Sequence, residues 1–236
     1  KIEYLHNKQI DKIKWDACIQ NAINSRIYAF SWYLDIVSKG WDCLMYGDYE
    51  LVFPIVFKRV MFFKKIYQPL FCQQLGPFSI NYKLLNDNLI LSQIIFFLEK
   101  KYGHFEVSIN CDSSNLVKKI VSNYQLNINC VDRINLELDL FADYKKLFSN
   151  YNTNTKRNLK NAFKYNLSIE NMQKIDCFLD LFKNNTGVKA HLKEYEYNTI
   201  KSLISTCVEK KIGLLSGVYD RDGNLLACTF LISYLN

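Results

Sequence analysis

Two apolar runs near the end of the chain flank a short polar segment, and they form the clearest pattern in the sequence. The runs cover residues 212–219 and 225–234, and residues 220–224 between them read DRDGN. The Asp222-Gly223 pair supplies the positive φ angle that a tight hairpin turn needs. The pattern predicts a β-hairpin of two long strands, the second of which would leave an apolar edge for another chain to pair with.

The first half of the chain alternates helix-like and strand-like spacing of its apolar residues. Helix-like spacing is seen at Ile10, Ile13 and Ala17, for example. The predicted helices cover residues 10–24, a short segment with Ser31 as its N-cap, 87–101 and 114–123. The predicted strands cover residues 41–47, 49–58, 66–73, 104–110 and 126–138. This half therefore reads as a mixed α/β layer.

The second half is predicted to place helices and one strand ahead of the terminal hairpin. The predicted helices cover residues 140–149, 154–164, 174–185 and 192–211, and the strand covers residues 166–171. The N-cap of the helix that ends at residue 164 is predicted at Asn154 or Thr155. The second of these helices has two faces, because its charged and apolar residues fall on separate arcs of about 100° at 3.6 residues per turn. The cations are Lys156, Arg157, Lys160 and Lys164, and the apolar residues are Leu159, Ala162 and Phe163.

Composition fits one large domain or two small ones with packed cores. The chain has 236 residues, of which 49% are hydrophobic and 15% aromatic, with only 8 Gly and 3 Pro. The net charge of +7 favours an anionic partner, although ordinary solubility explains it equally well. No apolar run approaches the roughly 20 residues of a membrane-spanning helix, so we expect no membrane span.

Cysteine and histidine usage argues against a metal site and for a reducing compartment. The eight cysteines are scattered singly without a CxxC pair, and the chain has only three histidines. A structural zinc site needs clustered ligands, so no metal site is expected. Unpaired thiols fit a reducing cytosol, and we expect a cytoplasmic protein.

The basic face of the helix near residue 160 is the best local candidate for binding a phosphate or carboxylate. Arg157 is able to bind such a group bidentately, whereas Lys156 and Lys160 act as point charges. Tyr151, in the preceding loop, is placed to join the site. The alternative is a solvated basic face. Trp32 and Tyr33 are candidates for lining a pocket, and the alternative for them is a place in the core.

A second basic segment surrounds an apolar loop in the first half of the chain. Lys58, Arg59, Lys64 and Lys65 flank residues 60–63, which read VMFF. One interpretation is a solvated strand end. The other is a loop that faces a membrane or a substrate.

Three stretches of the sequence resemble the Fem-type aminoacyltransferases and their GNAT-like acyltransferase relatives, a bacterial group. They are residues 28–41 (YAFSWYLDIVSKGW), 67–78 (YQPLFCQQLGPF) and 155–164 (TKRNLKNAFK). The resemblance implies an α/β fold of two tandem GNAT-like mixed sheets flanked by helices. The first GNAT-like domain would be residues 1–138. The second would be residues 139–236 and would lack its C-terminal part, because the glycine-rich turn that binds acyl-CoA in GNAT proteins is absent.

The resemblance also implies transfer of an acyl or aminoacyl group from a CoA or tRNA carrier to an amine. The co-substrate would be acyl-CoA or aminoacyl-tRNA, with no firmly bound cofactor, and the partner an anionic or tRNA-linked molecule. Arg157, with Lys156 and Lys160, matches the family's anion-contacting positions; no catalytic residue stands out. Two alternatives remain: a non-catalytic GNAT-fold module that binds nucleic acid or protein, and a self-associating protein that forms a homodimer through the C-terminal strand.

Overall fold

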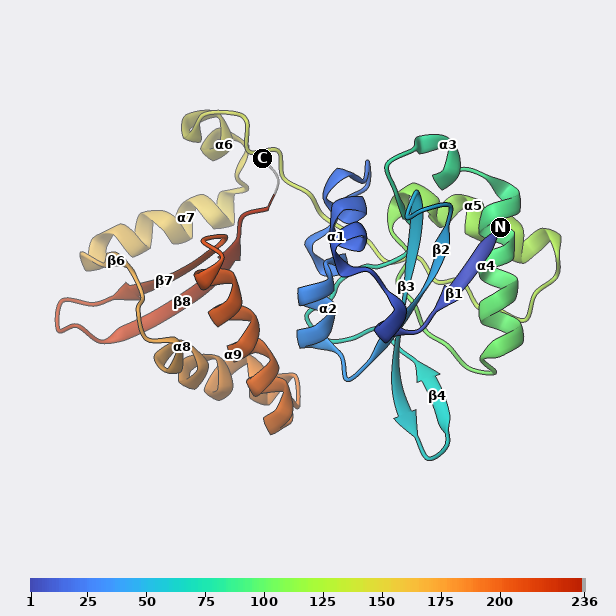
Figure 1. Cartoon of the computed structure of the whole chain (residues 1–236). Coiled ribbons are helices and arrows are strands. Elements are labelled where there is room, and N and C mark those ends of the chain that lie inside the picture. Colours follow the sequence, from blue (N-terminus) through green and yellow to red (C-terminus); the bar gives the residue numbers. More distant parts are fainter. Residues whose placement is uncertain (235–236) are drawn as a thin grey trace. The chain divides into compact units, whose positions relative to one another are not determined.

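The computed structural model describes residues 1–234 and divides the chain into two compact units (Figure 1). Unit 1 is Lys1–Cys130, and unit 2 runs from Val131 through the remaining described residues. Each unit has its own antiparallel sheet with helices packed against it, so the predicted α/β (α+β) class is confirmed. Within the described residues, no helix is long and apolar enough to cross a membrane.

The sheet of unit 1 is built around one long central strand. The strands are β1 (Ile2–Leu5), β2 (Trp41–Tyr46), β3 (Leu51–Val60), β4 (Phe63–Ile66) and β5 (Phe78–Ser79). Their order is β1-β2-β3-β4, and β5 pairs with the start of β3. Pro54 lies between the residues of β3 that pair with β5 and those that pair with β4, so its missing N–H interrupts neither ladder.

Helices cover both faces of this sheet (Figure 1). They are α1 (Lys12–Asn21), α2 (Ser31–Val37), α3 (Tyr82–Leu85), α4 (Asn88–Lys101) and α5 (Cys111–Asn123). One core cluster joins α1 and α2 to Cys43 and Met45 of β2. The other joins α4 and α5 to Leu44, which lies between Cys43 and Met45 along β2. The alternation of side chains along a strand therefore divides the core into two layers.

Two helices of unit 1 begin at an aspartate cap, and a third begins one residue before the cap that the sequence predicts. Asp11 and Asp87 accept backbone N–H groups in the first turns of α1 and α4. The prediction of Ser31 as an N-cap is wrong, since Phe30 holds that position in α2. The Ser31 hydroxyl instead donates to Asp16, at 2.8 Å, which ties α2 to α1.

Three of the predicted strands of the first half are wrong. The strand expected at residues 66–73 is displaced, because the chain pairs as β4 at Phe63–Ile66 and then becomes irregular. Residues 104–110 contribute only isolated bridges at Phe105 and Ile109. Residues 126–138 form no strand, and Ile134 and Leu136 are about nine-tenths exposed. Alternating apolar residues form a strand only where a second strand is available to pair with them.

Unit 2 contains a three-stranded sheet in the order β6-β7-β8. Its strands are β6 (Ser168–Asn171), β7 (Gly213–Tyr219) and β8 (Leu225–Ile232). Its helices are α6 (Tyr144–Asn150), α7 (Thr153–Ala162), α8 (Ile175–Phe182) and α9 (Glu194–Glu209). The predicted terminal hairpin is confirmed, with Gly223 at a φ of 80° in its turn. Helix α9 contacts β7 and α8 contacts β8, and they bury Phe178, Ile204 and Leu215 between them.

Candidate functional site

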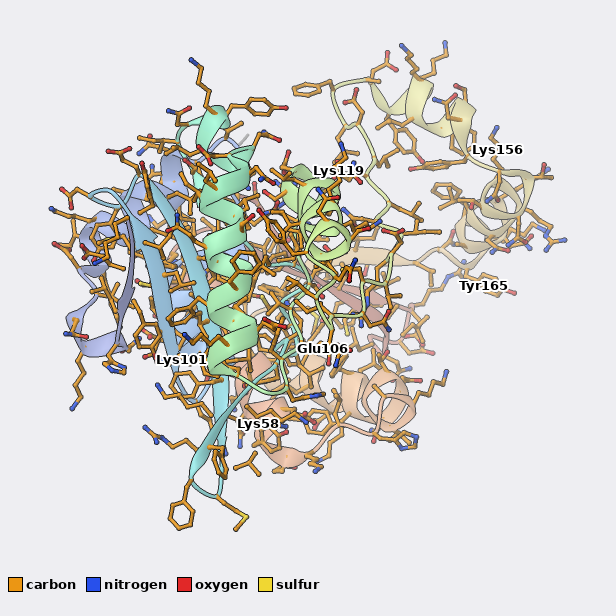
Figure 2. All side chains as sticks on the ribbon, turned by 90° about the vertical axis from the view of Figure 1, so that its right-hand side faces the viewer. Lys58, Lys101, Glu106, Lys119, Lys156 and Tyr165 are labelled. Atoms are coloured by element: carbon orange, nitrogen blue, oxygen red, sulfur yellow. The ribbon has the colours of Figure 1, made fainter. Side chains whose placement is uncertain are left out.

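The basic segment of unit 2 is helix α7, and its start is fixed by an asparagine. The Oδ1 atom of Asn152 accepts the backbone N–H of Thr155 at 2.8 Å and caps the helix. The predicted cap at Asn154 or Thr155 is therefore wrong by two or three residues. The helix continues as a 3₁₀ turn, Phe163–Tyr165, and ends where Asn166 takes a left-handed conformation. Lys156 and Tyr165 mark this segment in Figure 2.

The three cations of α7 that the sequence predicts as site residues differ in their exposure and in their hydrogen bonds. Lys156 is half-buried. Its Nζ atom donates to the Ser149 carbonyl at 2.7 Å and lies 5.8 Å from the centre of the Phe148 ring. Arg157 is exposed, and one N–H of its guanidinium donates to Asn154 Oδ1 at 2.7 Å. Lys160 is exposed. Within residues 1–234, none of the three forms an ion pair with a carboxylate. Arg157 and Lys160 are therefore available to an external anion, whereas Lys156 also holds α6 against α7.

The apolar side of α7 is less covered than the sequence predicts. Leu159 is half-buried, whereas Ala162 and Phe163 are exposed, Phe163 to 77%. The expected packing face is thus reduced to Leu159. Tyr151 is half-buried and its ring lies 5.8 Å from that of Phe148, so it belongs to the aromatic contact between α6 and the start of α7.

A hollow of about 670 Å³ opens in unit 2 where the helical segment ends. It is lined by Lys164, Tyr165 and Leu167 on one side, and by the turn of the β7–β8 hairpin and Leu226 on the other. Arg221 in that turn adds a cation to the lining. The Asp220 carboxylate is occupied by hydrogen bonds from Asn224 and the turn amides, which hold its pKa below the ordinary value. Arg221 was missed in the sequence because its segment reads only as a turn.

Trp32 and Tyr33 lie on α2 of unit 1. Tyr33 is 2% exposed, and its hydroxyl donates to the Phe71 carbonyl. Trp32 is half-buried and meets the Tyr33 ring edge-on at 5.4 Å. Of this pair, Trp32 is the more exposed residue. The six sequence-predicted residues therefore divide into two groups: Trp32 and Tyr33 in unit 1, and Tyr151, Lys156, Arg157 and Lys160 in unit 2.

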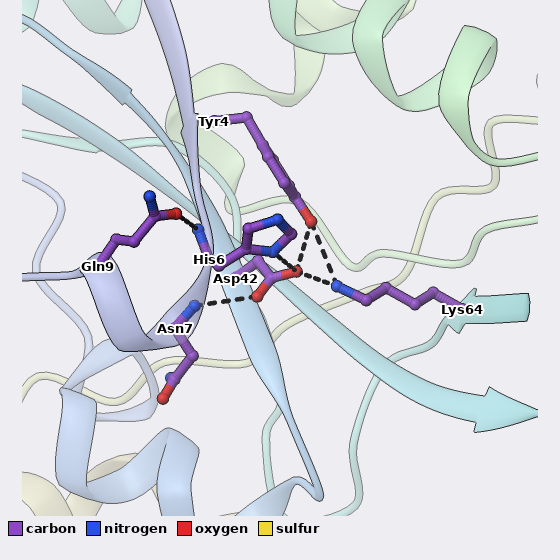
Figure 3. Close-up of polar contacts among 6 residues, drawn as sticks. All are labelled: Tyr4, His6, Asn7, Gln9, Asp42 and Lys64. Atoms are coloured by element: carbon purple, nitrogen blue, oxygen red, sulfur yellow. Dashed lines mark hydrogen bonds and ion pairs between the residues drawn. The ribbon is translucent and has the colours of Figure 1, made fainter.

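A polar cluster in unit 1, which the sequence analysis missed, is centred on Asp42 of β2 (Figure 3). The Asp42 side chain is 3% exposed. Its Oδ1 atom accepts the Asn7 backbone N–H at 3.0 Å, and its Oδ2 atom accepts hydrogen bonds from Tyr4 of β1 and Lys64 of β4. His6 Nδ1 lies 3.6 Å from the same oxygen. One carboxylate thus links the two ends of the strand order β1-β2-β3-β4.

The electrostatics of this cluster favour a charged Asp42. Burial by itself would raise the pKa of the carboxyl, but the hydrogen bonds from Lys64, Tyr4 and the Asn7 amide outweigh it and lower the pKa. Burial and the bond to Asp42 raise the pKa of Tyr4, which stays protonated and donates. A charged residue inside the apolar strand WDCLMY is the sequence signal that would have revealed the cluster.

The described residues contain no group of three or more His, Cys, Asp or Glu placed to hold a metal ion. The eight cysteines are all free thiols. Of these, Cys18 and Cys43 are buried, which raises the pKa of each to about 12. They behave as small core residues.

Comparison with known proteins gives a fold likeness. No protein-family model matches the chain. No curated protein matches it either. Among solved structures, the crystal structure of FemX matches with a TM-score of 0.56 and 13% sequence identity, over 92% of this chain and 57% of the FemX chain. The chain thus has a FemX-like fold and spans a little over half the length of that protein.

Proposed function

We propose that this chain provides the substrate-binding framework of a Fem-type acyl- or aminoacyltransferase. The observation that carries the proposal is the FemX-like fold over 92% of the chain. The resemblance of residues 155–164 to the Fem-type basic helix supports it, since that segment forms α7 with Arg157 and Lys160 exposed. The proposed reaction moves an acyl group from a CoA or tRNA carrier to an amine.

The proposed anion site consists of Arg157 and Lys160, with Lys156 holding the helix against α6. A guanidinium presents two parallel N–H donors to a phosphate, and Asn154 occupies only one of its nitrogens. Tyr151 contacts Phe148, whose ring lies 5.8 Å from the Lys156 ammonium group. Trp32 is proposed as a substrate contact of unit 1, and Tyr33, a core residue whose ring meets Trp32 edge-on, as the residue that holds it in place. The division into GNAT-like domains 1–138 and 139–236 is part of the same proposal.

The test is calorimetric titration of the whole chain with aminoacyl-tRNA, acyl-CoA and UDP-linked muropeptide. We expect one of these ligands to bind, and Arg157→Ala to weaken that binding about tenfold or more, because a charge-assisted bidentate contact is lost. Arg157→Lys should recover only part of the affinity, since an ammonium group lacks the two-pronged geometry. Lys119→Ala, which removes an exposed cation of α5, is the control and should bind as the unchanged chain does.

Binding and transfer are separate outcomes. The alternative of a non-catalytic module predicts binding of RNA that weakens steeply with salt, without any acyl transfer. Failure of all three ligands to bind would end the transferase proposal. If Arg157→Ala bound the ligand with the same affinity as the unchanged chain, Arg157 of α7 would not be part of the binding site.

A further inference from the structure

The hairpin formed by β3 and β4 ends in an exposed apolar tip. Val60, Met61, Phe62 and Phe63 are exposed to 46%, 84%, 91% and 75%. Loop tips are usually polar or contain glycine. Here Met61 takes a φ of 54°, a conformation that glycine or asparagine adopts at lower cost. The tip thus keeps large apolar side chains in water at a position where smaller, polar ones fit the backbone better.

The tip projects because the end of the hairpin stands apart from the rest of the sheet. Pairing of β2 with β3 stops at Val56, and from Phe57 to Val60 the strand β3 pairs only with β4 among the described strands. Figure 2 shows this two-stranded ribbon extending beyond the other elements of unit 1, with Lys58 near its base. The ribbon is held to the sheet through Lys64, one ladder pair from the tip, because its ammonium group is bound to the buried Asp42 and lies 4.0 Å from the ring of Phe57 at the ribbon's base.

Three further cations lie directly behind the tip. Lys58, Arg59 and Lys65 are exposed, and Lys58 pairs with Lys65 across the ladder. Residues 57–66, FKRVMFFKKI, contain no aspartate or glutamate to balance them. The hairpin therefore combines an apolar end with a collar of positive charge that no residue of the hairpin itself neutralises.

We infer that this hairpin docks the protein on an anionic lipid surface. The apolar side chains at residues 60–63 would enter the boundary between headgroups and acyl chains, and Lys58, Arg59 and Lys65 would lie against the lipid phosphates. Aromatic rings and long basic side chains suit that interface because each has an apolar body and a polar end. A protein partner fits less well, since a two-stranded tip offers far less than the roughly 1,000 Å² of a specific interface. This docking is independent of the proposed acyl transfer.

The experiment is co-sedimentation of the whole chain with vesicles of phosphatidylcholine alone or mixed equally with phosphatidylglycerol. We expect binding to the mixed vesicles, at least tenfold tighter than to phosphatidylcholine, that weakens as salt is added. Met61→Asp combined with Phe62→Asp should lower this binding tenfold or more, because charged tip residues do not enter the interface. Arg59→Gln combined with Lys65→Gln should lower it by about 25-fold, on the basis of about fivefold for each cation near an anionic surface.

Ile13→Asp is the matched control, because Ile13 is 84% exposed, as Met61 is, but lies on α1 away from the tip. It should bind the mixed vesicles as the unchanged chain does. All variants alter exposed side chains, and unchanged circular dichroism and thermal melting would confirm that they fold. Absence of binding to the mixed vesicles would overturn the inference, and so would equal binding by the tip variant. Light scattering that finds a dimer, which the tip variant converts to monomer, would assign the tip to a second copy of the chain instead.

Discussion

Asp42 shows how a single buried residue organises one edge of unit 1. Its carboxylate accepts hydrogen bonds from a tyrosine on β1, a lysine on β4 and a backbone amide between β1 and α1. Burying such a carboxylate alone is costly, and it is favourable here only because three hydrogen-bond donors, one of them the lysine, compensate its negative charge. The position of β4 in the β3–β4 hairpin therefore depends on a residue of β2, two strands away.

Replacement of Asp42 by asparagine is expected to lower the free energy of unfolding by about 3 kcal/mol, because Lys64, whose side chain is only 19% exposed, loses its counter-charge. Urea unfolding measures this. Since the pKa of Asp42 is lowered in the folded state, its contribution is complete above the unfolded pKa of about 3.9 and is lost as the pH falls below it. The difference between the two proteins should therefore shrink as the pH is lowered from about 5 through the lowered folded-state pKa of Asp42. A difference that stays constant over that range would show that charge is not the cause.

At the scale of elements, the sequence predicts best where the partner of a segment is close in the chain. The β2–β3 pair and the β7–β8 hairpin join neighbouring segments, and both follow from two apolar runs with a turn between them. Helices α4, α8 and α9 follow from helical spacing and their ends. The segments 66–73 and 126–138 also read as strands, but the second forms no strand and the first is irregular after Ile66. Pairing between segments that are distant in the sequence cannot be read from the spacing of apolar residues.

Helix α7 shows how the boundary of an element depends on one hydrogen bond. We expect Asn152→Ala to weaken the first turn of α7 by about 1 kcal/mol, because the N–H of Thr155 loses its acceptor. Hydrogen exchange of the α7 amides should become about fivefold faster. Asn158→Ala is the control, since it changes an exposed position inside the helix and alanine is a better helix former. If Asn154→Ala had the larger effect instead, the helix would begin where the sequence alone places it.

At the scale of the whole molecule, the candidate site is only partly visible in the sequence. The charged face of α7 follows from helical spacing, because its cations are local to one helix. The cluster around Asp42 joins residues 4, 42 and 64, and the hollow beside Tyr165 joins two segments about 55 residues apart. Such groupings depend on tertiary packing. The core position of Tyr33 likewise depends on the Phe71 carbonyl that its hydroxyl reaches.

The irregular segment that spans the boundary of the two units leads to a prediction about the molecule as a whole. Residues 127–142 lack regular structure, and Ile134, Leu136 and Phe141 are 91%, 89% and 98% exposed. Arg133 lies in this stretch and offers a bond to trypsin, which needs an extended, accessible backbone. We therefore expect brief digestion at a low trypsin ratio to cut first after Arg133 and to leave an N-terminal fragment of residues 1–133, seen by mass spectrometry. Arg133→Gln should slow that cut without changing the order of the later ones. First cleavage within β3, at Lys58 or Arg59, would mean that the hairpin opens more readily than the connection between the units, contrary to its ladder with β4.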